Sequence, residues 1–202
     1  MAGQISPLVV QDLRQRTGAG MMDCKKALVE TDGDMDKAIE FLRKKGISAA
    51  EKKAGRETSQ GSVTSYIHGG GRIGVMVEIN CETDFVARNE NFQDFTKDIA
   101  MHIAATNPRF LSKEEVPQDV LNKEREILKE QTKGQGKPEH VMDKIIEGKV
   151  LKFFEENCLL NQPFVKDTNL TIEEYLKQTI AKIGENIVIK RYVRYELGQV
   201  DS

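Results

Sequence analysis

Residues 81–87, with the sequence CETDFVA, bring a thiol, carboxylates, a hydroxyl and an aromatic ring together at the end of a predicted strand. Asp84 and Phe85 stand side by side there, and such a pair can present an apolar wedge beside a charge, which is a surface for binding another protein. In the other interpretation, Thr83 or Asp84 caps a turn and Phe85 fills the core. Residue chemistry alone favours this second interpretation.

A second candidate for binding is the segment 17–22, with the sequence TGAGMM. Met21 and Met22 follow a glycine-containing loop, and methionine is a flexible side chain that adapts to the shape of a partner. The same two residues could instead begin a helix and pack inward. The pattern leaves both interpretations open.

The common catalytic motifs are missing from the sequence, which has no Walker A loop, no GxGxxG after a strand, no HExxH and no GxSxG. The histidines, His68, His102 and His140, are dispersed, and the three cysteines lack metal-ligand spacing. His102 lies at the edge of an apolar helical face, where a histidine with satisfied hydrogen bonds is the default interpretation. We therefore expect neither an enzyme nor a bound cofactor or metal.

The composition is that of an ordinary globular protein: 39% of the 202 residues are hydrophobic, 31% are charged, and the formal net charge is −2. No stretch approaches 18 apolar residues, and the first residues lack the features of a signal peptide, so we expect no membrane association and a cytoplasmic location. The near-neutral charge gives no reason to expect direct nucleic-acid binding. A short basic cluster, Lys52, Lys53 and Arg56, fits a solvated linker equally well.

Three short helices are predicted within the first 46 residues. Ser6 and Pro7 are typical of a helix start. Apolar side chains recur at helical spacing on the second helix and on the third, which Asp34 caps and Gly46 ends. We predict a three-helix module with a polar linker over residues 1–56.

A second domain is predicted over residues 57–202. Apolar and polar residues alternate in its strands, so one face of each should be buried, and three glycines between the first two strands indicate a hairpin. Strands separated by long helical stretches predict an α+β fold with a mainly antiparallel sheet and flanking helices. The predicted elements are strands 63–67 and 72–81, a helix from Asn91, an antiparallel helical hairpin over 117–157, a helix from Thr171 and a strand over 187–197.

Two long runs in the sequence resemble the signatures of the elongation factor Ts family. The first is Leu13-Arg14 followed by TGAGMMDCKKAL at 17–28, and the second is NCETDFVA at 80–87. Shorter matches follow in family order, namely RIGV at 72–75, AMHIAA at 100–105, QPFV at 162–165 and IGENI at 183–187. Together these runs span essentially the whole chain.

The resemblance implies a role in translation. Members of this family release guanine nucleotide from a GTPase partner, elongation factor Tu, and they are not enzymes. The magnesium ion at that nucleotide site belongs to the partner. The N-terminal helices resemble a ubiquitin-associated-like module, and by position Arg14, Met21 and Met22 would contact the nucleotide-binding domain of the partner.

The resemblance also assigns a role to the segment 83–86, which we call the corner. The wedge of the family corresponds by position to Thr83, Asp84, Phe85 and Val86, supported by Ile73, Gly74 and His102. Asp84 and Phe85 would push against helices beside the partner's nucleotide site. Displacement of those helices would then disturb the partner's magnesium and phosphate cradle.

Longer members of the family carry two related halves in their core, whereas this chain has one RIGV strand and one AMHIAA helix. It therefore resembles the short form, in which two copies pair to rebuild the missing half, and we expect a homodimer through the sheet region. A general protein-binding adaptor is the alternative, with the N-terminal module recognising a peptide or a ubiquitin-like surface. Such an adaptor would bind a GTPase without altering the rate at which nucleotide leaves it.

Overall fold

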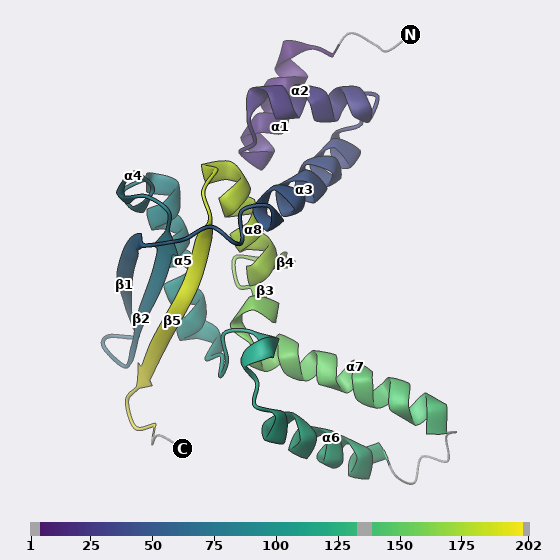
Figure 1. The fold of residues 1–202 in the computed structure, drawn as a ribbon, viewed down its shortest axis with the longest axis vertical. Helices are drawn as coiled ribbons and strands as arrows, with labels where there is room; N and C mark the ends of the chain where they lie inside the picture. Colours follow the sequence, from purple (N-terminus) through teal and green to yellow (C-terminus); the bar gives the residue numbers. More distant parts are fainter. Residues whose placement is uncertain (1–4, 133–138, 200–202) are drawn as a thin grey trace. The chain divides into compact units, whose positions relative to one another are not determined.

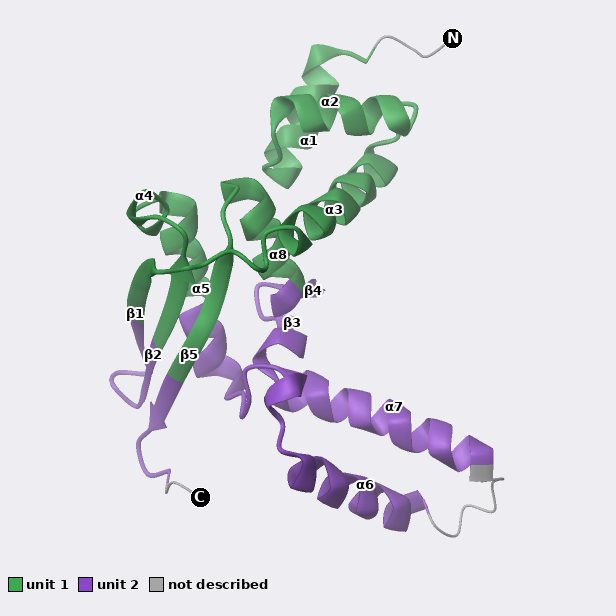
Figure 2. Cartoon of the chain, in the orientation of Figure 1, with its two compact units in different colours: residues 1–64, 77–98, 174–192 green, residues 65–76, 99–173, 193–202 purple. Residues whose placement is uncertain are grey.

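The fold is that of a computed structural model, which describes residues 5–132 and 139–199 (Figure 1). The described part forms two compact units (Figure 2). Unit 1 takes in the described residues of 1–64, 77–98 and 174–192, and unit 2 takes in those of 65–76, 99–173 and 193–202. This grouping differs from the predicted domains at 1–56 and 57–202, which stay a prediction.

Unit 1 begins with three helices, α1 (Pro7–Thr17), α2 (Met21–Glu30) and α3 (Met35–Glu51). The side chain of Ser6 accepts a hydrogen bond from the amide of Leu8 at the start of α1, and the side chain of Asp34 accepts one from the amide of Lys37 at the start of α3. Helices α1 and α3 therefore start at the expected capping residues. The helices enclose a small core of Val10, Leu13, Cys24, Ala27, Leu28 and Ala38. The ubiquitin-associated-like character of this bundle stays a prediction.

Helix α3 is longer than the sequence predicted, because it continues through Gly46 instead of ending there. A Cβ placed on Gly46 would lie 3.3 Å from the Cβ of Ala181, which belongs to α8 (Ile172–Ile183). The glycine therefore lets the two helices approach closely. Arg43 and Glu174 form an ion pair of 2.5 Å between the same two helices.

A three-stranded sheet has the order β1 (Gln60–His68), β2 (Ile73–Cys81), β5 (Ile187–Glu196). Neighbouring strands run in opposite directions (Figure 1). The turn between β1 and β2 uses three glycines, Gly69–Gly71, all with positive φ. The alternation predicted for β2 is confirmed in the middle of the strand, since Val75, Val77 and Ile79 are buried and Met76 between them is exposed, while Ile73 is half-buried. The predicted α+β class with a small antiparallel sheet is therefore correct.

One face of the sheet is covered by α5 (Glu90–Thr106), which Figure 1 draws behind the strands. The apolar face predicted for this helix is buried and comprises Phe92, Phe95, Ile99 and Ile103. In the first half of β5, Ile187 and Ile189 are buried. The second half does not continue this burial of alternate apolar residues. There it is Arg194 that faces α5, since it donates from Nε to the carbonyl of Ala104 at 3.3 Å. Val193 and Tyr195 consequently face away from α5 and are exposed.

Unit 2 also contains α6 (Gln118–Thr132) and α7 (Glu139–Asn157), which pack together through Leu128, Ile146 and Val150. These helices lie within the predicted hairpin at 117–157, whose predicted connection falls largely outside the described residues. Two strands that the sequence did not predict, β3 (Pro163–Phe164) and β4 (Asp167–Thr171), pair antiparallel before α8. The remaining elements are the one-turn helix α4 (Asp84–Ala87) and the 3₁₀ turns η1 (Lys113–Glu115) and η2 (Leu159–Asn161).

Candidate functional site

The corner lies in unit 1, where β2 ends at Cys81 and α4 begins at Asp84. Thr83 is the N-cap of α4, and its Oγ1 accepts a hydrogen bond from the amide of Val86 at 3.4 Å. The side chain of Phe85 is 81% exposed. The interpretation in which Phe85 fills the core is therefore wrong, although Thr83 does cap the turn as that interpretation required.

A charge pair accompanies the exposed ring on the same helical turn. Asp84 accepts a hydrogen bond from Nη2 of Arg88 at 3.0 Å. At the far end of α4, Gln93 donates from Nε2 to the carbonyl of Ala87 at 2.6 Å. The corner thus presents an apolar ring beside an acidic group, the combination that can bind another protein surface.

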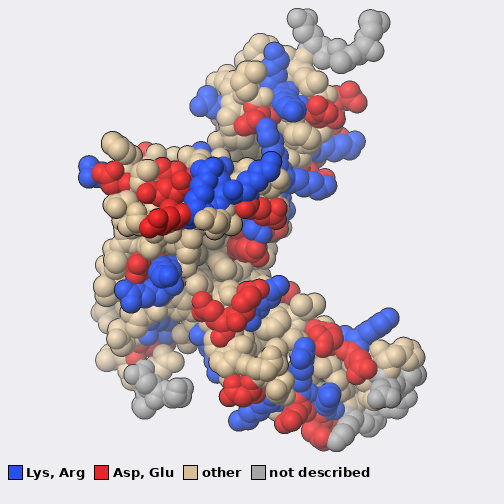
Figure 3. Space-filling model, in the orientation of Figure 1, with Lys and Arg blue, Asp and Glu red and all other residues tan. Residues whose placement is uncertain are grey.

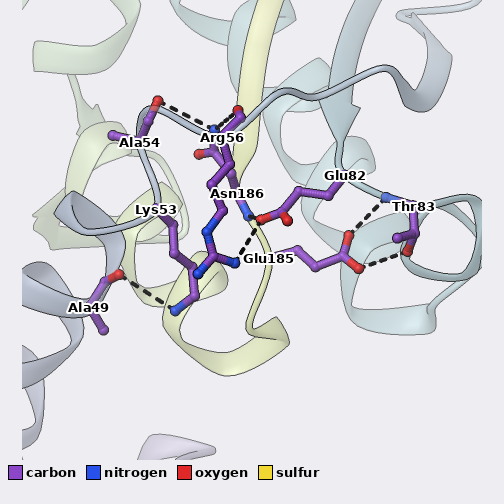
Figure 4. Close-up of polar contacts among 8 residues, drawn as sticks. All are labelled: Ala49, Lys53, Ala54, Arg56, Glu82, Thr83, Glu185 and Asn186. Carbon is purple, nitrogen blue, oxygen red and sulfur yellow. Dashed lines mark hydrogen bonds and ion pairs between the residues drawn. The ribbon is translucent and has the colours of Figure 1, made fainter.

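A network of carboxylates and backbone groups extends from Thr83 of the corner to the residues that follow α3 (Figure 4). Glu185, in the loop between α8 and β5, accepts hydrogen bonds from the amide and the hydroxyl of Thr83. Glu82 accepts from the amide of Asn186 at 2.6 Å and pairs with Arg56 at 3.4 Å. No sequence pattern predicted this network, although Glu185 and Asn186 belong to the IGENI run that carried part of the resemblance.

The thiol beside the corner is not a nucleophile at neutral pH. Cys81 is buried, and its Sγ donates to the carbonyl of Thr83 at 3.1 Å. Burial, and then the negative charge of Glu185, raise the pKa of Cys81 to about 11. A thiol with such a pKa stays protonated, whereas nucleophilic cysteine chemistry needs the thiolate.

The two candidate methionines lie at the start of α2, in unit 1. Met22 is 76% exposed and Met21 is 45% exposed, while Cys24, Ala27 and Leu28 are the residues of this helix that face the core. Inward packing of the methionines is therefore the wrong interpretation. Arg14 is likewise exposed, on α1.

The other three predicted site residues, Ile73, Gly74 and His102, belong to unit 2. Gly74 lies beside Ile67 of β1, since a Cβ at Gly74 would be 3.4 Å from the Cδ1 of Ile67. Ile73 and Gly74 are half-buried. Neither of them is as accessible as Phe85 or Met22.

His102 is wholly buried on α5, and its ring has partners on both nitrogens. The amide of Val165 donates to Nδ1 at 3.3 Å, so Nε2 carries the proton and donates to Oε1 of Gln162 at 2.9 Å. Burial lowers the pKa of His102 and so favours the neutral form of the ring. The ring holds the segment 162–165 in place, as the default interpretation predicted, and it cannot touch a partner directly in this conformation.

Acidic and basic side chains are interspersed over the visible face of the molecule (Figure 3). Among the residues that the structure describes, no three His, Cys, Asp or Glu side chains gather as a metal site would need. Within residues 5–132 and 139–199, every helix falls short of the length and hydrophobicity that a membrane crossing requires.

Comparison with known proteins gives one consistent family. The sequence profile described as Elongation factor TS matches residues 48–199 of the chain. The chain is 60% identical over 195 residues to Elongation factor Ts of Thermoanaerobacter sp. (strain X514), which covers 96% of both chains. It is 59% identical over 196 residues to Elongation factor Ts of Desulforamulus reducens, covering 97% of this chain and 90% of the relative. Identity to Elongation factor Ts of Geobacter metallireducens is 60% over 195 residues, which is 96% of this chain and 90% of the relative.

Proposed function

We propose a specific activity for this chain, which belongs to the elongation factor Ts family and is a translation elongation factor. It binds elongation factor Tu in the GDP-bound form and speeds the release of GDP. It does so by binding alone, as a nucleotide exchange factor and not as an enzyme, and it needs no cofactor of its own. The proposal also includes a cytoplasmic location and no direct contact with nucleic acid.

The observation that carries this proposal is the exposed ring of Phe85 at the corner. In the proposed complex, Asp84 and Phe85 press against helices beside the partner's nucleotide site and disturb the groups that hold magnesium and phosphate. A large apolar side chain that its own chain leaves 81% exposed gains free energy only when something else covers it. If the nucleotide-free partner covers the ring and the GDP-bound partner does not, then binding of this chain and binding of GDP oppose each other.

The ring cannot supply the whole effect. Burying one phenylalanine is worth about 1.5 to 3 kcal/mol. A ten-thousandfold weakening of nucleotide binding requires a differential affinity of about 5.5 kcal/mol. The remainder must come from the rest of the interface, for which we propose Arg14, Met21 and Met22 on the N-terminal bundle, in the manner of a ubiquitin-associated-like module. The exposure of both methionines supports this assignment.

The direct test is the dissociation rate of a fluorescent GDP analogue from purified elongation factor Tu, measured with increasing concentrations of this chain. Exchange activity predicts a rate that rises and then saturates as the complex forms. An adaptor would bind elongation factor Tu in a parallel pull-down or titration and leave the dissociation rate unchanged. That second result would overturn the proposed function.

We also propose that two copies of the chain pair through the sheet, on the side away from α5. Exposed apolar side chains gather there in unit 2, namely Ile67, Met76, Val193, Tyr195 and Leu197. Gly74 leaves space between them on β2, where it adjoins Ile67. An apolar surface of this kind is typical of a face that another protein covers.

Met76→Lys is expected to convert the dimer to a monomer, because it places a charge in the middle strand of the apolar face. Sedimentation equilibrium would then give 22.8 kDa for the variant, the mass of one chain, and twice that mass for the wild type. Leu151→Lys is the matched control, since Leu151 is an exposed apolar residue of α7 and lies outside the sheet. A wild-type chain that sediments as a monomer would contradict the pairing.

A further inference from the structure

Helix α4 carries the exposed ring of Phe85 but is not held in place by burial. It has four residues, all of them described, and none is buried. A single helical turn is unstable in isolation, because fixing its backbone costs more free energy than its few hydrogen bonds return. The direction in which Phe85 points must therefore depend on the bonds at the two ends of α4.

Two of these bonds come from Glu185, at the N-terminal end of α4. Its Oε2 accepts from the amide of Thr83 at 3.0 Å, and its Oε1 accepts from the hydroxyl of Thr83 at 2.7 Å. Hydrogen bonds to an ionised carboxylate are stronger than those between neutral groups. Because the hydroxyl hydrogen of Thr83 is given to Glu185, the oxygen is left to accept from the amide of Val86 and so to cap α4.

The loop that carries Glu185 is itself anchored (Figure 4). The next residue, Asn186, is buried. Its backbone N–H donates to the carboxylate of Glu82, and its side-chain Nδ2 donates to the carbonyl of Arg56 at 2.9 Å. Two neighbouring hydrogen bonds thus join the end of β2 to the loop before β5. In one, Glu185 accepts from the backbone of Thr83, and in the other, Glu82 accepts from the backbone of Asn186. Residues 102 positions apart in the sequence fix each other at this point.

We propose that Glu185 is a positioning residue for nucleotide exchange, acting through Thr83 to hold α4 and Phe85 in the orientation that engages the partner. The proposal rests on the proposed function of the corner. Without the carboxylate, Thr83 is free to rotate and α4 samples other orientations, so the ring must be ordered during binding. The free energy needed to order the ring slows the exchange step, whereas the contact made by Met21 and Met22 is unchanged.

The test is GDP release from elongation factor Tu at saturating and half-saturating concentrations of the variants. Glu185→Ala should lower the saturating rate by about 10-fold, the effect of losing a charge-assisted pair of hydrogen bonds. The half-saturating concentration should change by less than about 2-fold, because the interface outside the corner is intact. Glu185→Gln keeps one oxygen acceptor and should recover part of the rate.

A double variant separates positioning from a general loss of stability. If Glu185 acts through the ring, then Glu185→Ala should have almost no further effect in a chain that already carries Phe85→Ala. Glu174→Gln is the matched control, since this glutamate of α8 forms an ion pair with Arg43 of α3, and the variant should exchange at the wild-type rate. Thermal melting of each variant shows whether the chain is folded, and Glu185→Gln, which preserves shape, carries the test if Glu185→Ala does not fold.

Two outcomes would overturn the proposal and leave the proposed function intact. One is a normal saturating rate for both Glu185 variants while Phe85→Ala is slow. The other is a double variant whose loss is the full product of the two single losses, which would mean that the residues act independently. A normal rate for Phe85→Ala would instead contradict the role proposed for the corner itself.

Discussion

Phe85→Ala should lower the saturating rate of GDP release from elongation factor Tu by about 10- to 100-fold, the rate equivalent of losing the burial of one phenylalanine in the exchange step. The melting temperature should change by less than about 2 °C, because the ring is 81% exposed and contributes little to the core of its own chain. The measurement is stopped-flow release of a fluorescent GDP analogue, paired with a thermal melt of the free variant.

The control for this variant is Leu151→Ala, which removes an exposed apolar side chain from α7 instead of from the corner. It should leave the saturating rate within about 2-fold of the wild type, since a surface leucine away from the corner supplies no force on the nucleotide site. A Phe85→Ala variant that exchanges as fast as Leu151→Ala would show that the ring does not act as a wedge.

Gly61→Ala should destabilise the chain by about 3 to 5 kcal/mol, the sum of a strained backbone and an overlap in a packed site. Gly61 lies near the start of β1 with φ of +145°, a conformation that residues with a Cβ rarely adopt. A Cβ there would also overlap the carbonyl oxygen of Ile79 and lie 2.7 Å from the Cα of Asn80, both in β2. β1 would have to move away from its neighbour.

The expected drop in melting temperature for Gly61→Ala is about 10 °C for a chain of this size. Gly55→Ala is the matched control, because Gly55 lies in the exposed linker and an added Cβ meets nothing within 4 Å. That variant should melt within about 2 °C of the wild type. Equal melting temperatures for the two alanine variants would show that β1 does not approach β2 as closely as described.

Elements with a strong local pattern could be predicted from the sequence. The alternation of Val75, Val77 and Ile79 predicted a half-buried strand, and the spacing of Phe92 and Ile99 predicted the buried face of α5. Gly46 was misjudged because a glycine that ends a helix and one that admits a neighbouring helix have the same local sequence. Only the proximity of Ala181, far along the chain, distinguishes the two.

The candidate site could be predicted only in part. The residues of the corner could be identified from their types and their place at the end of a strand, but their chemistry favoured a buried Phe85, because a large aromatic side chain is normally inside a protein. Only the resemblance gave them the role of a wedge. Its exposure follows from the short α4 turn, which buries none of its residues. The hydrogen bonds between Glu185 and Thr83 could not be predicted from the sequence, since no local pattern links the two residues.

The most direct test of the coupling between GDP binding and binding of this chain is the affinity of the chain for elongation factor Tu with and without bound GDP and magnesium, measured by titration calorimetry. Coupling between the two binding events is reciprocal, so GDP must weaken the binding of this chain by the same factor by which the chain weakens the binding of GDP. We predict a markedly higher dissociation constant in the presence of GDP. Equal dissociation constants in the two states would contradict the account.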